Sequence, residues 1–135
     1  MSTNRQNILG RIEDDLQALS TIKKVENNKS GIFDIETVPL PCAFIYPGPE
    51  TRVNGVIGYE SWIWKIYIEI WAKDKDMETL LEDVHEKLFS DERLGGYADR
   101  SYRTGADIMF VDPERSLEDL IIEYTVEHKH LKGAM

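Results

Sequence analysis

The sequence has few of the cysteines that form disulfides and no long apolar run of the kind that spans a membrane. Cys42 is the one cysteine in 135 residues, so no disulfide can form within the chain, which is typical of a reducing cytosol. The longest nearly apolar run, residues 66–72, contains Glu69 and is far shorter than the roughly 20 residues that cross a bilayer. The first 20 residues are polar and interrupted, unlike a signal peptide. We therefore expect a cytosolic protein that has no membrane partner.

Basic residues are also scarce. The chain has 16 Lys and Arg against 25 Asp and Glu, which gives a formal net charge of −9. Residues 1–67 carry 7 basic and 8 acidic side chains, whereas residues 68–135 carry 9 basic and 17 acidic ones. Binding to a nucleic-acid duplex depends on a basic face that displaces counterions from phosphates. The charge therefore argues against a nucleic-acid partner.

Few residues are suited to catalysis. The nine glycines never take the spacing of a phosphate-binding or dinucleotide-binding loop, and no G-x-S-x-G motif occurs. Cys42 lies in the apolar run 42–46, where a thiol is expected to be buried and unreactive. Glu69 and Asp107 are the only carboxylates with the apolar neighbours that a general acid needs, and such strand carboxylates are common. We expect neither catalytic residues nor a cofactor.

Three histidines are candidate zinc ligands, because three imidazoles and a water can complete a zinc site. His128 and His130 are two residues apart in an extended segment, so both point to one face. His85 belongs to a helical segment, and no spacing rule links it to the other two. Without a dense Cys/His cluster, we predict no metal site.

Hydrophobic periodicity predicts two amphipathic helices. In residues 4–19 the apolar side chains recur every three or four positions, and residues 75–89 repeat this pattern. The first apolar stripe consists of Ile8, Leu9, Ile12, Leu16 and Leu19. The second consists of Met77, Leu80, Leu81, Val84, Leu88 and Phe89.

Alternating polarity predicts strands, most clearly in residues 60–72. There Trp62, Trp64, Ile66, Ile68 and Ile70 share one face, and Ile63, Lys65, Tyr67, Glu69 and Trp71 share the other. Further extended segments are expected at 21–25, 42–46, 106–111 and 120–129, and a weaker one, optional in the order of elements, is expected at 33–37. The last of these also has some helical spacing, but its dense β-branched residues favour a strand.

The remaining segments are expected to be loops. Residues 47–59 contain Pro47-Gly48-Pro49 and Asn54-Gly55, and are predicted to project as a long hairpin loop. A polar connection is expected at 97–104, a turn at 112–116 and a flexible tail at 131–135. Together these elements predict a single domain, 1–135, of the α+β class. It has a mainly antiparallel sheet with two amphipathic helices on one face, in the order α-β-β-β-α-β-β.

Two helices can cover one face of such a sheet, so the other face has no helix of its own. Ile63, Tyr67 and Trp71 form an apolar stripe along it. Either a loop of the chain, such as 26–41, folds over this stripe, or another subunit covers it. The loop 47–59 would offer a second contact surface, through Arg52, Val53, Asn54 and Val56.

Taken in order, the chain combines a short amphipathic helix (8–19), a proline-flanked strand (39–46), and an aromatic, alternating strand (61–71). The aromatic strand leads into an acidic helix that ends at residues 91–97, and a closing strand (121–128) lies near the C-terminus. This arrangement resembles that of bacteriophage tail-terminator proteins, also called tail-completion or minor tail proteins.

The resemblance implies a structural virion protein and carries no catalytic residues over to this chain. Such proteins form a ring, usually a hexamer, that caps the growing tail tube, ends its polymerisation and presents a surface to the head or neck. The implied partners are further copies of the chain, the tail-tube protein and a head–tail connector or neck protein. The implied location is the head-proximal end of the tail, and the host cytoplasm during assembly.

A ring needs two different complementary patches on each subunit. The stripe of Ile63, Tyr67 and Trp71 and the loop 47–59 are the predicted patches. Two other functions stay open from the sequence: a small α+β enzyme or ligand-binding domain, and an adaptor that recognises one protein partner.

Overall fold

The computed structural model describes residues 4–27, 39–53, 59–73, 77–112 and 117–131 of the chain. These residues form two α-helices, one 3-10 helix and five strands. In chain order the elements are α1 (Asn4–Gln17), β1 (Lys24–Asn27), β2 (Cys42–Val53), β3 (Tyr59–Lys73), α2 (Met77–Phe89), η1 (Leu94–Gly96), β4 (Arg100–Asp112) and β5 (Leu117–Leu131).

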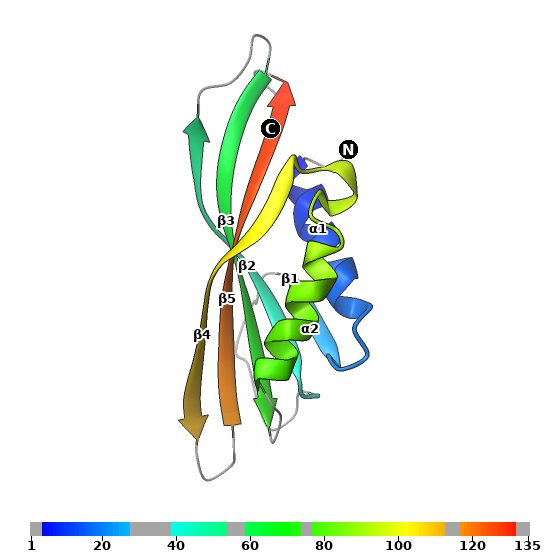
Figure 1. The fold of residues 1–135 in the computed structure, drawn as a ribbon, viewed down its shortest axis with the longest axis vertical. Helices are drawn as coiled ribbons and strands as arrows, with labels where there is room; N and C mark the ends of the chain where they lie inside the picture. The colour runs from blue at the N-terminus through cyan, green and yellow to red at the C-terminus, as the bar shows by residue number, and fades with distance from the viewer. Residues whose placement is uncertain (1–3, 28–38, 54–58, 74–76, 113–116, 132–135) are drawn as a thin grey trace.

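The strands form one twisted sheet in the order β1-β2-β3-β5-β4. The pairs β2–β3, β3–β5 and β4–β5 are antiparallel, and only the short β1 runs parallel to its neighbour β2. Both helices lie on the same side of this sheet (Figure 1). The predicted α+β class and the order α-β-β-β-α-β-β are therefore confirmed.

The core lies between the helices and one face of the sheet. Ile8, Ile12 and Leu16 of α1 are at most 2% exposed, because their spacing of four residues puts them on one side of the helix. They belong to the same cluster as Trp64 and Ile66 of β3, which alternate onto the helix side of the sheet. Each such side chain contributes roughly 1.5–3 kcal/mol through its removal from water. Neither α1 nor α2, with 14 and 13 residues, is long and apolar enough to span a membrane.

The predicted loop 47–59 is wrong over most of its length. Residues 47–53 continue β2, and Tyr59 is the first residue of β3. These strand ends, together with the end of β5, extend past α1 at the top of Figure 1, so the projection there is sheet. Residues 54–58 lie outside the described residues.

A bulge explains how two prolines fit into β2. Pro47 pairs with Ile66 and Glu50 with Trp64, so β2 has one residue more than β3 between these pairs. Proline cannot donate to a ladder, and the bulge falls where β1, which ends opposite Ile45, no longer covers the β2 edge. The two prolines therefore interrupt the hydrogen-bond ladder without ending the strand. From the sequence alone, Pro47-Gly48-Pro49 is equally compatible with a turn that ends the strand.

Gly48 makes this bulge possible because a side chain would not fit there. A Cβ atom at this position would lie 2.6 Å from the Tyr67 ring and 2.7 Å from the backbone oxygen of Lys65. We expect Gly48→Ala to lower the free energy of unfolding by about 1–3 kcal/mol, as is usual for overpacking. Urea unfolding measures this effect, and Gly10→Ala, where no atom lies within 4 Å of the added Cβ, is the control. Equal stability of the two variants would show that the bulge accepts a side chain.

Other boundaries also differ from those expected. β4 begins at Arg100, so most of the expected connection 97–104 is strand. Exposure alternates from Ser101 to Ala106, but the less exposed positions hold Ser101, Arg103 and Gly105, so no apolar face reveals the strand in the sequence. Leu131 ends β5 and is not part of a tail, while the rest of the expected tail, like the expected strand 33–37, lies outside the described residues.

Candidate functional site

The candidate site is the sheet face opposite α1 and α2, which we call the outer face. At its centre, Ile63, Tyr67 and Trp71 of β3 are half-buried, as are Lys65 and Glu69 between them. On the opposite face of the same strand, Trp64, Ile66, Ile68 and Ile70 are 0% exposed. The period of two in the strand thus separates a sealed core face from a partly accessible one.

Aromatic side chains of β2 lie beside the apolar stripe, where Tyr46 is half-buried and Phe44 is only 1% exposed. Tyr46 pairs directly with Tyr67, and the ring centroids of Tyr46 and Phe44 are 6.5 Å apart. Glu69 lies among these rings as a hydrogen-bond acceptor. Trp71 Nε1 donates to Glu69 Oε1 at 2.9 Å, and the Tyr46 hydroxyl donates to the same oxygen at 3.4 Å. The cluster is therefore amphipathic, with aromatic edges fixed around one carboxylate.

Burial and the neighbouring Glu69 together raise the pKa of Tyr46 to about 12. The phenol therefore remains a donor at every pH at which the protein is handled. Glu69 accepts two bonds from aromatic donors in this arrangement, which organises the cluster and differs from the apolar pocket expected of a general acid. Asp107, the other carboxylate considered as a general acid, is exposed on β4.

Beyond the stripe, the outer face carries paired charges on β5 and β4. Lys65 Nζ lies 3.0 Å from Glu123 Oε1, and the Thr104 hydroxyl donates to Glu123 Oε2 at 3.0 Å. The Lys65 bond, then the Thr104 bond, lower the pKa of Glu123. A second group centres on Glu127, whose Oε2 accepts 2.8 Å bonds from Arg100 Nε and the Tyr102 hydroxyl. The charges are locally balanced, so the outer face is polar at its margin.

A pocket of about 230 Å³ lies at the end of the outer face where β2, β3 and β5 extend beyond the helices. Val53 and Ile63 contribute apolar lining, and Lys129 and Asp99, whose Nζ and Oδ2 atoms are 3.6 Å apart, contribute charge. Small-molecule sites typically have volumes of about 300–1,000 Å³. The pocket is therefore smaller than a typical small-molecule site.

The structure brings some of the predicted contact residues together. Val53 lies near Ile63 around the pocket, so it extends the stripe and does not form a separate patch. Arg52 pairs with Trp62, so it is an exposed residue on the opposite face of the sheet. Asn54 and Val56 lie outside the described residues. Of the predicted second patch, one residue thus joins the first patch and another faces away from it.

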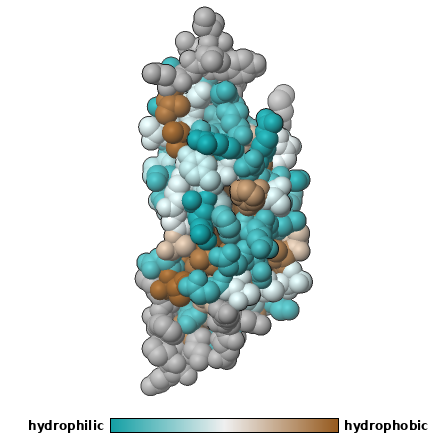
Figure 2. All heavy atoms as spheres, viewed as in Figure 1, coloured by the Kyte–Doolittle hydropathy of each residue, from teal (hydrophilic) through white to brown (hydrophobic). Residues whose placement is uncertain are grey.

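The large apolar side chains that are most exposed among the described residues lie elsewhere. Phe89 at the end of α2 is 67% exposed, and Tyr97 is 44% exposed. The stripe itself is half-buried, so it presents edges of its side chains and not whole rings. Figure 2 shows a mainly hydrophilic surface in which brown patches are small and separate, in the view of Figure 1.

A buried polar group that the sequence analysis missed joins β2, β5 and α1. The His128 side chain is 0% exposed, and its Nε2 lies 2.7 Å from Glu50 Oε2. Its Nδ1 lies 3.3 Å from the Asn4 amide nitrogen at the start of α1. Arg5 stacks 4.6 Å above the Trp64 ring, next to this pair. Glu50 and His128 are 78 residues apart, so no local spacing could have indicated the contact.

The candidate zinc ligands do not form a site in the described part of the chain. His128 contacts Glu50 through its Nε2 atom. His85 lies on α2 beside Phe89, with ring centroids 6.1 Å apart. Within the described ranges, no group of three or more His, Cys, Asp or Glu side chains is arranged to hold a metal ion. Cys42 is buried, as expected, and burial raises the pKa of its thiol to about 11, which keeps it protonated.

Comparisons with known proteins show a shared fold. No family model matches the chain. No curated protein matches its sequence. Among solved structures, a chain of the "virion of native gene transfer agent (GTA) particle" is similar, with a TM-score of 0.52 and 8% sequence identity. The match covers 90% of this chain and 94% of that chain, so the two folds correspond over nearly their whole length.

Proposed function

We propose that the chain is a structural protein of a phage-like virion, and specifically a tail terminator. In this proposal several copies, six by analogy with the family it resembles, form a ring that caps the tail tube. The ring ends tube polymerisation and provides the surface to which the head or neck attaches. The proposal assigns the chain no catalytic activity and no cofactor. Its partners are other copies of itself, the tail-tube protein and a connector or neck protein.

The observation that carries the proposal is the fold likeness to a chain of a virion particle over 90% of this sequence. The order of elements independently resembles that of tail terminators. Fold alone does not fix function, so the proposal also needs a surface suited to assembly. The outer face supplies an amphipathic one: half-buried aromatic edges at its centre, paired charges at its margin and a pocket at one end.

This composition matches that of protein interfaces, which have an apolar, aromatic-rich core and a polar rim. In the proposed ring, the stripe of Ile63, Tyr67 and Trp71 is the centre of the contact with the next copy. In a closed ring, the stripe of one copy contacts a different surface patch on the next copy.

Charging the stripe should therefore block assembly. We expect Ile63→Asp to convert the ring to monomer, because the carboxylate would lose its hydration at the centre of the contact. Ile63 is the best stripe position to change, because it is half-buried and borders the pocket. Sedimentation velocity of the purified variant measures its oligomeric state, and circular dichroism verifies that it is folded.

Phe89→Asp is the matched control for position in the fold. Phe89 is 67% exposed on the helix layer, so a charge there costs little in folding. If Ile63→Asp loses the ring and Phe89→Asp keeps it, the stripe is the sensitive surface. A folded Ile63→Asp variant that still forms the ring would contradict the assignment of the outer face. Loss of the ring in Phe89→Asp alone would place the contact on the helix layer instead.

A further inference from the structure

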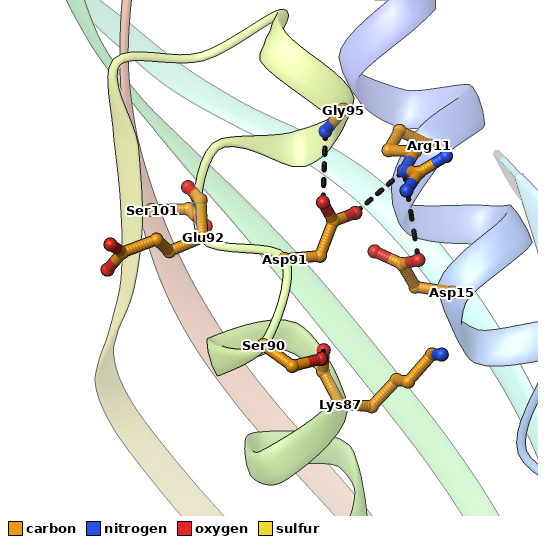
Figure 3. Close-up of polar contacts among 8 residues, drawn as sticks. All are labelled: Arg11, Asp15, Lys87, Ser90, Asp91, Glu92, Gly95 and Ser101. Carbon is orange, nitrogen blue, oxygen red and sulfur yellow. Dashed lines mark hydrogen bonds and ion pairs between the residues drawn. The ribbon is translucent and has the colours of Figure 1, made fainter.

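A second polar group connects α1 to the turn that follows α2. Arg11 of α1 lies between two carboxylates (Figure 3). Its Nε donates to Asp91 Oδ2 at 2.7 Å and lies 3.8 Å from Asp15 Oδ1, one helical turn along α1. The other oxygen of Asp91 accepts a bond from the Gly95 backbone nitrogen at 3.0 Å. Asp91 thus has donors for both oxygens.

Asp15 is in a different position. It is only 6% exposed, and its Oδ2 is a buried oxygen with no hydrogen-bond donor among the described residues. A buried ionised carboxylate with an unsatisfied oxygen is costly, because it has lost its hydration without compensation. If Asp15 is protonated, the same oxygen becomes a donor, and Asp91, which lies on the same Arg11 nitrogen as Asp15, is the neighbouring acceptor. A proton between the two carboxylates therefore resolves the orphaned oxygen.

We propose that Asp15 and Asp91 share one proton, and that this proton holds α1 against the turn after α2. The two carboxylates come from elements far apart in the sequence and meet at one guanidinium, so a single ionisation acts on the contact between two helices. When the pair loses the proton, two negative charges face one Arg11, and Asp15 retains an unsatisfied oxygen. The junction is then weakened. This inference is independent of the proposed virion function.

The surroundings of the pair favour this behaviour. Burial of Asp15, followed by its hydrogen bond to Asp91, raises the pKa of Asp15 to about 7. Arg11 from α1 and Lys87 from α2 oppose the shift only in part. Burial of Asp91 acts in the same direction, but hydrogen bonds from Asp15, Arg11 and Gly95 outweigh it and lower the pKa of Asp91 to about 2. When two carboxylates share a site, the pKa of one typically rises and the pKa of the other falls.

The effect on stability differs for the two groups. The pKa of Asp15 is raised, so its contribution is fully present below its unfolded value near 4 and is lost as the pH rises toward 7. The pKa of Asp91 is lowered, so its contribution is present above about 4 and is lost as the pH falls toward 2. The junction is therefore tightest at mildly acidic pH and weakens through the neutral range.

The turn also connects this junction to the sheet. Glu92, next to Asp91, accepts a bond through its backbone oxygen from the hydroxyl of Ser101, at 2.9 Å. Ser101 is buried at the start of β4 (Figure 3). The turn that holds Asp91 is therefore bonded both to α1, through Arg11, and to the start of β4, through Ser101.

A carboxyl-carbon NMR titration of the full chain tests the shared proton without any substitution. We expect the side-chain carbon of Asp15 to titrate with a midpoint above pH 5, well above the ordinary range of an aspartate. A midpoint for Asp15 at or below pH 5 would overturn the proposal. This measurement decides the question even if a variant fails to fold.

Asp15→Asn tests the consequence for stability, with Asp14→Asn as a control of the same charge change one residue away. In the wild type and Asp14→Asn, the folding equilibrium constant should fall at least about tenfold from pH 5 to pH 8, a figure that corresponds to one pKa unit. Asp15→Asn should lose most of this dependence. Hydrogen exchange of residues 11–17 should show the same difference. Identical pH profiles in all three proteins would show that the carboxylate pair does not hold α1 in place.

Discussion

Trp64→Ala should cost about 3–5 kcal/mol of unfolding free energy, the usual range for removing a large buried aromatic side chain. Trp64 is 0% exposed at the centre of the sheet, and its indole nitrogen donates to the Gly48 backbone oxygen at 3.1 Å. Its loss would leave a cavity beneath α1 and also release the bulge of β2. Because Arg5 stacks on its ring at 4.6 Å, the start of α1 would lose a contact as well.

Chemical denaturation followed by circular dichroism measures this loss. Tyr97→Ala is the control. Tyr97 is an aromatic residue that is 44% exposed, so its removal should lower the unfolding free energy only slightly. A Trp64→Ala protein whose unfolding free energy lies within about 1 kcal/mol of the wild-type value would contradict the described core. Truncating a buried aromatic side chain of this size lowers the unfolding free energy by more than that.

Glu50→Ala should have the next largest effect, with a loss of about 3 kcal/mol. The substitution would leave His128 fully buried without the carboxylate that lies 2.7 Å from its Nε2. Removing one member of a buried polar pair typically costs about 3–5 kcal/mol, because the remaining group keeps its desolvation penalty. The destabilisation should be concentrated where β2, β3 and β5 meet the start of α1.

Glu50→Gln separates hydrogen bonding from charge in this pair. The amide keeps an oxygen as acceptor, so we expect a smaller loss than for alanine. Glu82→Ala, at an exposed position on α2, should change the stability by no more than about 0.5 kcal/mol. Thermal unfolding of the three variants at one pH gives the comparison. If Glu50→Ala and Glu82→Ala were equally stable, the buried pair would contribute nothing to the fold.

The parts of the fold that the sequence predicted are those with a local signal. α1, α2 and β3 each repeat apolar residues at the period of their own backbone, and each was found within a few residues of its expected bounds. The length of β2 was missed because Pro47 and Pro49 are strong turn signals, and only tertiary pairing shows that a bulge accommodates them. The start of β4 was missed because its less exposed positions hold Ser101, Arg103 and Gly105, so its sequence does not alternate between apolar and polar residues.

The candidate site was predictable to the same extent. That Ile63, Tyr67 and Trp71 share a face follows from the period of a strand, and the absence of helices there follows from having two helices and one sheet. The pairing of Val53 with this face depended on the extended β2 strand and could not be foreseen. The contacts of Glu50 with His128 and of Arg11 with Asp91 span 78 and 80 residues, and periodicity carries no information at that range.

The central claim is that copies of this chain assemble through the outer face into a ring on a tail tube. Native mass spectrometry tests it most directly, on the purified chain alone and on the chain mixed with tubes of the tail-tube protein. We expect a single closed oligomer, a hexamer by family resemblance, in at least the second sample, and its loss in Ile63→Asp. A monomeric mass in both samples at every concentration would contradict the account.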